Sequence, residues 1–173
     1  MRDKLRKRYH VHKEVAQGGR FEGEIELSEL ERLGELLYAG GTGAEQRKVI
    51  VDFEFTRSEF DTPLLVGHLQ AGLTLECQRC LQPMELPLSL DFSLLVDASE
   101  DMVRQGGRDT LYSDEGYIDI AEVVEDEIIL ALPLVAMHDD TECNSNWQVS
   151  AAAAEPAERE NPFAVLQQLK TTD

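Results

Sequence analysis

The sequence has no long hydrophobic run. Its longest apolar runs, such as residues 128–135, fall far short of the roughly 20 residues of a membrane-spanning helix, and Pro133 interrupts that run. The chain begins with a basic segment, but Tyr9 and His10 follow it where a secretory signal would have its apolar core. We therefore expect a cytoplasmic protein that makes no contact with a membrane.

Cysteine is also scarce, with only three residues in a chain of 173. An odd count in a reducing compartment argues against a disulfide framework. The cysteines are then either metal ligands or small buried side chains.

Aromatic and basic residues are few. Aromatic residues make up 6% of the chain, and no predicted strand has the adjacent exposed aromatic side chains on which single-stranded RNA stacks. The 16 basic residues face 34 acidic ones, which gives a net charge of −18. Because phosphate repels such a body at long range, the composition argues against RNA binding by the whole surface. We expect any contact with RNA to be indirect.

One segment departs from this acidity. Residues 1–13 hold six basic side chains against the single acid Asp3. Such an arm either contacts phosphate or remains a solvated or self-docking tail. If the protein touches RNA directly, the predicted nucleic-acid residues are Arg2, Lys4, Arg6, Lys7, Arg8 and Lys13.

Hydrophobic periodicity predicts an α+β fold. Residues 46–96 contain three successive stretches in which apolar and polar residues alternate with a period of two, and residues 21–27 contain one shorter stretch. Their connections are too short for parallel crossovers, so the pattern predicts an antiparallel meander. Gly72, in the middle of one stretch, is typical of a bulge or a bend.

Two helices are expected beside this sheet. Ser28 and Glu31 form a capping-box pattern before a leucine-rich stretch that ends at the glycines after residue 39. Residues 119–132 are amphipathic, with Asp119 at the N-cap and Pro133 as a stop signal. We expect the second helix to cover the apolar face of the sheet.

The chain divides into four predicted parts: a basic arm (1–13), an α+β domain (14–145), an Ala/Glu/Pro-rich linker (146–160) and a short C-terminal helix (161–173) on a flexible tail. The C-terminal helix opens with an N-cap residue followed by proline. It has the form of a peptide that docks in a hydrophobic groove, either of a partner or of its own domain. The candidate partner-binding residues are Asn161, Pro162, Phe163, Leu166 and Leu169.

Two pairs of residues suggest a metal site. Cys77 and Cys80 lie where one predicted strand ends and the next begins, and His138 and Cys143 follow the amphipathic helix. Zinc takes four such donors in tetrahedral geometry, so we predict one structural Zn²⁺ if the fold brings the pairs together. The alternative is that the cysteines are small apolar turn residues. A thioredoxin-like redox role is disfavoured because a strand, not a helix, follows the second cysteine.

The amphipathic helix also carries five carboxylates, Asp119, Glu122, Glu125, Asp126 and Glu127. Paired acids can bind Mg²⁺ and support phosphodiester hydrolysis. The simpler interpretation is that Glu122, Glu125 and Asp126 form the polar side of the helix, and that acids near its N-terminus stabilise the helix dipole. The sequence contains no nucleotide-binding or hydrolase motif, and we expect a protein that is not an enzyme.

Three segments resemble the YceD-like family, the large-subunit ribosomal RNA accumulation proteins of bacteria and plastids. They are Leu-Glu-Cys-Gln-Arg-Cys at residues 75–80, the helix string at residues 118–133 with its trailing His138 and Cys143, and Asn-Pro-Phe-Ala-Val-Leu at residues 161–166. The resemblance spans about residues 46–170, whereas the first dozen residues are more basic than the family pattern.

The resemblance implies a non-enzymatic ribosome biogenesis factor needed for synthesis, processing or stability of large-subunit ribosomal RNA. The acidic composition is better suited to an adaptor that binds ribosome assembly or RNA-processing proteins than to a direct RNA reader. Two alternatives remain open: a carboxylate-metal ribonuclease acting on precursor ribosomal RNA, and a zinc-containing interaction adaptor unrelated to RNA.

Overall fold

The structure is a computed structural model that describes residues 3–38, 48–97, 109–139 and 143. The chain separates into two compact units, Met1–Asp139 and Asp140–Asp173. The predicted linker and C-terminal helix, including Asn161, Pro162, Phe163, Leu166 and Leu169, lie outside the described residues. The fold described below is that of the first unit.

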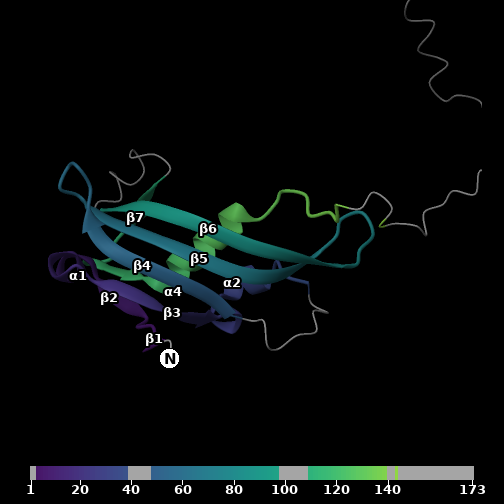
Figure 1. Ribbon diagram of the computed structural model, residues 1–173, viewed down its shortest axis with the longest axis horizontal. Helices are drawn as coiled ribbons and strands as arrows, with labels where there is room; N and C mark the ends of the chain where they lie inside the picture. The colour runs from purple at the N-terminus through teal and green to yellow at the C-terminus, as the bar shows by residue number, and fades with distance from the viewer. Residues whose placement is uncertain (1–2, 39–47, 98–108, 140–142, 144–173) are drawn as a thin grey trace, which may run out of the picture. The chain divides into compact units, whose positions relative to one another are not determined.

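The first unit is built on a six-stranded sheet with the order β1-β3-β4-β5-β6-β7 (Figure 1). Its strands are β1 (Asp3–Lys4), β3 (Arg20–Glu26), β4 (Lys48–Arg57), β5 (Pro63–Glu76), β6 (Pro83–Asp97) and β7 (Thr110–Tyr112). Strands β3 to β6 pair antiparallel in sequence order, which confirms the predicted meander. Strands β1 and β7 each add a short parallel pairing at the two edges. Gly72 causes no bulge, because the register of β5 with β6 continues through it.

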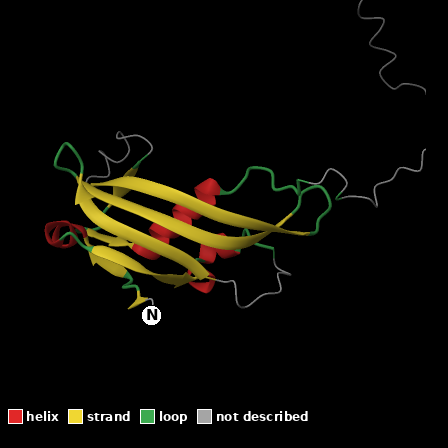
Figure 2. Cartoon of the chain, viewed as in Figure 1, coloured by secondary structure: helices red, strands yellow, loops and turns green. Residues whose placement is uncertain are grey.

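A two-stranded sheet and the helices complete the unit. The small sheet pairs β2 (Arg8–His10) with β8 (Tyr117–Asp119). The helical elements are α1 (Val11–Gln17), the 3₁₀ helix η1 (Leu27–Glu29), α2 (Glu31–Gly34) and α4 (Ile120–Ala131). Figure 2 shows α4 crossing one face of the large sheet. The fold is therefore α+β, with the sheet dominant.

Helix α4 forms as the sequence predicts. The Asp119 side chain accepts a hydrogen bond from the backbone N–H of Ala121 at 3.0 Å and so caps the helix. Val123 and Ile128 are buried, because the apolar stripe of the helix faces the sheet. The prediction that this helix covers the sheet is confirmed.

The core lies between α4 and the inward rows of the strands. Alternate residues of β4 and β5, such as Val51 and Leu69, are completely buried, as expected of a sheet with one covered face. At one end of the core an aromatic cluster brings ring centroids within 4.8 to 6.2 Å of one another. Its members are Tyr9, Phe21, Phe53 and Phe55.

The predicted helix beginning at Ser28 is wrong in its start and its length. Ser28 lies inside η1, and the N-cap of α2 is Leu30, which makes no side-chain capping bond. Leu27, Leu30 and Leu33 are spaced by three residues and all are buried. This spacing suits a tight 3₁₀ turn better than a long α-helix, so the leucines reach the core through two short pieces.

The basic segment is part of the folded unit and not a separate arm. Tyr9 and Val11 are almost completely buried, and β1 and β2 pair with other strands. The apolar side chains of this segment therefore complete the core.

Candidate metal centre

The first cysteine pair sits in the turn between β5 and β6. Cys77 directly follows β5, and its N–H donates to the carbonyl of Gln82 at 2.9 Å. The N–H of Leu81 donates back to the carbonyl of Cys77 at 2.8 Å, and Leu81 adopts a left-handed backbone with φ 59°. These bonds close the turn and hold Cys77 and Cys80 at the same end of the hairpin.

The segment after α4 returns to this turn. The backbone N–H of Gln78 donates to the carbonyl of Ala136 at 2.8 Å. A guanidinium nitrogen of Arg79 lies 3.7 Å from the sulfur of Met137. The fold therefore closes the long sequence gap between the cysteine pair and His138, as the metal prediction required.

His138 is oriented like a metal ligand. Its Nδ1 atom lies 3.5 Å from the sulfur of Cys80, and its Nε2 atom lies 3.2 Å from the carbonyl oxygen of Pro83. A carbonyl can only accept, so Nε2 carries a proton, and in the neutral ring the lone pair of Nδ1 points toward Cys80. Ligating histidines usually make such a second bond, which fixes the ring.

The buried thiol of Cys77 has a pKa below that of an ordinary cysteine. Burial raises its pKa, but hydrogen bonds from the backbone N–H groups of His138, Cys80 and Arg79, and from the Cys80 thiol, outweigh burial and lower the pKa to about 5. The thiolate is the form that binds metals. At neutral pH the turn therefore favours the negatively charged thiolate of Cys77, whose charge a bound metal cation would neutralise.

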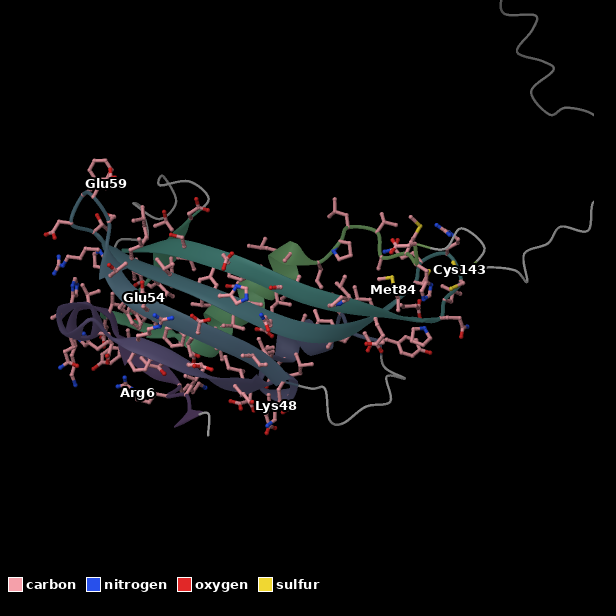
Figure 3. The ribbon with its side chains drawn as sticks, viewed as in Figure 1. Arg6, Lys48, Glu54, Glu59, Met84 and Cys143 are labelled. Carbon is pink, nitrogen blue, oxygen red and sulfur yellow. The ribbon has the colours of Figure 1, made fainter. Side chains whose placement is uncertain are left out.

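Within the first unit, the ligand atoms of Cys77, Cys80 and His138 all lie within 4.8 Å of one another, whereas Cys143 belongs to the second unit. Figure 3 shows sulfur atoms gathered at this end of the sheet. In a tetrahedral zinc site with Zn–S bonds near 2.3 Å, neighbouring sulfurs are about 3.8 Å apart. A side-chain rotation covers a difference of this size, so the cluster could hold a metal ion.

Two carboxylates of α4, Glu125 and Asp126, form ion pairs within the fold. Glu125 is buried, and it accepts hydrogen bonds from the guanidinium of Arg32 at 2.8 Å and from the backbone N–H of Leu33 at 3.0 Å. Asp126 also contacts Arg32 at 2.8 Å. Placing Glu125 on the polar side of the helix did not predict its burial. Within the described residues the cysteine–histidine cluster is the one group of three or more His, Cys, Asp or Glu side chains close enough to share a metal ion.

The predicted nucleic-acid residues are spread over several elements. Arg6, Lys7 and Arg8 each lie near an acid of the same unit: Glu14 at 3.1 Å, Asp119 at 3.9 Å and Asp114 at 3.0 Å, respectively. Lys4 lies in β1 and Lys13 in α1, and Arg2 is outside the described residues. Arg6, Lys7 and Arg8 therefore do not form a free basic arm.

In the described part of the chain, no helix is long and apolar enough to cross a membrane.

Residues 65–170 match the family model described as large ribosomal RNA subunit accumulation protein YceD. The chain is also 33% identical, over 158 residues, to the large ribosomal RNA subunit accumulation protein YceD of Haemophilus influenzae, with 86% of each chain covered. No solved structure matches the chain. The extent of both sequence matches shows that the chain belongs to the YceD family of large ribosomal RNA subunit accumulation proteins.

Proposed function

We propose that this protein is a non-enzymatic factor required for the accumulation of large-subunit ribosomal RNA, through its synthesis, processing or stability. Family membership carries the proposal. The environment of the α4 acids supports its non-enzymatic part. Glu125 and Asp126 are engaged with Arg32 in tying two helices together, which is a structural use of carboxylates and not a catalytic one.

The protein acts by binding other proteins, and it contacts ribosomal RNA indirectly. The net charge of −18 opposes a phosphate backbone. Three of the basic residues that could offset this charge lie beside acids of the same unit. Partners among ribosome assembly or RNA-processing proteins, in the cytoplasm, fit this surface.

One structural Zn²⁺ is held by Cys77, Cys80, His138 and Cys143. The donor set and the thiolate-favouring turn suit zinc. Bound there, the ion would fasten the β5–β6 turn to the segment that follows α4. Its role is to order one end of the sheet and not to take part in a reaction.

The proposal is tested first with purified protein and large-subunit precursor RNA in the presence of Mg²⁺. We expect no cleavage by the wild type or by Asp126→Asn. Cleavage that Asp126→Asn abolishes would overturn the proposal in favour of a carboxylate-metal ribonuclease.

An affinity pull-down with and without RNase tests how partners are held. We expect ribosome assembly or RNA-processing proteins to remain bound after RNase treatment. Loss of these proteins on RNase treatment would show that contacts run through RNA. Recovery of partners unrelated to ribosomal RNA would favour the zinc-containing adaptor instead.

A further inference from the structure

The two edges of β6 can be told apart from its hydrogen bonds and its prolines. Pro83 turns its carbonyl away from β5 to His138, and Leu95 turns its N–H away from β5 to the carbonyl of Asp109 at 2.7 Å. Neighbouring residues of a strand point their backbone groups to opposite edges. The odd-numbered residues between these two therefore point away from β5. Pro87, which lacks an N–H, falls on the same edge, where proline is tolerated.

Among the described residues, the outer edge of β6 has no partner strand over residues 85–93. We call this stretch the open edge. At one end it is bounded by the contact of His138 with Pro83 and at the other by β7, which pairs only with residues 95–97. In the part of the chain that the structure describes, no strand pairs with the open edge and no backbone bond reaches it. The N–H groups of Glu85, Ser89, Asp91 and Ser93 are thus directed toward a strand position that no described residue fills.

The two faces of the open edge have different chemistry. Toward α4, Leu86, Leu88 and Leu90 are only half-buried, whereas the inward leucines of β5 are fully buried. Figure 1 shows the C-terminal end of α4 reaching the β6 side of the sheet, and Leu130 at that end is 79% exposed. On the other face Glu85 and Asp91 are exposed, and β6 contains no Lys or Arg.

We propose that the open edge of β6 binds an extended segment of a partner protein by strand addition. The bound segment alternates apolar residues, which cover the half-buried leucines, with Lys or Arg, which face Glu85 and Asp91. Backbone hydrogen bonds supply the binding energy and the alternation supplies selectivity. This inference rests on the proposed function as a protein-binding factor and names the class of partner.

A second copy of this chain is a poorer occupant. Pairing β6 with itself would place acidic residues of both copies on one face, and β6 has no basic side chain to offset them. Like charges on facing strands are destabilising. A basic extended segment meets the same edge with opposite charge.

The test uses the full chain and a capped fluorescent peptide of about nine residues that alternates lysine and valine, long enough to span the open edge. The disrupting variant is Ser89→Pro, which removes one outward N–H and blocks the edge as Pro87 does. Its matched control is Ser89→Ala, which removes only the hydroxyl that lies 3.4 Å from His68 Nε2. We expect saturable binding to wild type and Ser89→Ala, and binding weaker by at least about tenfold for Ser89→Pro, because a blocked edge excludes the docked strand.

Equal binding by Ser89→Pro and Ser89→Ala would overturn the inference, and so would the absence of saturable binding to the wild type. Equal binding of a peptide that alternates glutamate and valine would also overturn it, because charge then plays no part. Should Ser89→Pro fold poorly, the wild type alone decides the matter. Its Ser89, Asp91 and Ser93 amides should gain protection from hydrogen exchange when the lysine–valine peptide binds, and unchanged protection would contradict strand addition.

A separate measurement in cells distinguishes this inference from the proposed function. Both variants are expressed in place of the wild type, and large-subunit ribosomal RNA is quantified. Reduced accumulation with Ser89→Pro but not with Ser89→Ala supports the link between the edge and the function. Normal accumulation of large-subunit ribosomal RNA with Ser89→Pro, in spite of its lost peptide binding, would contradict that link. Strand addition at the open edge would still stand.

Discussion

Glu125 and Asp126 offer a matched test of what burial does to an ion pair. Both carboxylates lie 2.8 Å from the guanidinium of Arg32, but the Glu125 side chain is 7% exposed and that of Asp126 is 52% exposed. Glu125 also accepts a hydrogen bond from the backbone of the completely buried Leu33. Equal distances with unequal burial make the two residues controls for each other.

Glu125→Gln should reduce the free energy of unfolding by about 2 kcal/mol, because hydrogen bonds to a charged group contribute roughly 1.5–3 kcal/mol. Asp126→Asn should cost no more than about 0.5–1 kcal/mol, as is usual for exposed pairs. For a unit of this size the first value corresponds to a fall of roughly 6–8 °C in Tm. Thermal unfolding at a fixed zinc concentration measures both, since metal binding itself shifts the Tm.

The pH dependence gives an independent check. Burial raises the pKa of Glu125, but the Leu33 N–H and the Arg32 guanidinium outweigh it and lower the pKa below its ordinary value. The stabilisation is therefore fully present above the unfolded pKa of about 4.3, and it is lost as the pH falls through the lower folded pKa. The gap between wild type and Glu125→Gln should be constant near neutrality and shrink in acid. A loss for Glu125→Gln no larger than for Asp126→Asn would refute the reasoning.

Three further predictions concern the metal, the sheet and the basic segment. Protein purified without chelator should contain one zinc ion per chain. EDTA should lower the Tm of the wild type but not that of Cys80→Ser. A zinc content well below one equivalent would count against a structural ion. Gly67→Ala should destabilise by about 1–3 kcal/mol in denaturant unfolding, because an added Cβ would clash with the Phe92 ring. Gly72→Ala should be close to neutral in the same assay, because nothing lies within 4 Å of its added Cβ. Arg6→Ala should reduce the free energy of unfolding by about 1–3 kcal/mol in the same assay, since it leaves the buried Glu14 without its ion pair. Arg8→Ala removes an exposed ion pair and should reduce it by less than about 1 kcal/mol. A larger loss for Arg8→Ala than for Arg6→Ala would show that the basic segment is only loosely packed on the sheet.

The elements with strong local signals were predictable. The strands follow a period of two over long stretches, and α4 is marked at both ends by Asp119 and Pro133. The cysteine pair could be placed at a strand turn because Cys77 and Cys80 interrupt two such stretches. That His138 would approach Cys80 was a hypothesis, since only the packing of α4 brings the following segment back to the turn.

Other features depend on contacts that no local pattern encodes. The burial of Glu125 requires Arg32, which is 93 residues away in sequence. The first strands carry only a few apolar residues between charges, so Tyr9 and Val11 gave no periodic signal of a core segment. The short α2 replaced a longer predicted helix because three leucines, and not the capping pattern at Ser28, determine how this stretch packs.

The ratio of large-subunit to small-subunit ribosomal RNA in cells that lack this protein tests the account most directly. We predict that the ratio falls in its absence and is restored equally by the wild type and by Asp126→Asn, because the protein supports accumulation without cleaving RNA. An unchanged ratio in its absence, or a failure of stably folded Asp126→Asn to restore it, would contradict the account.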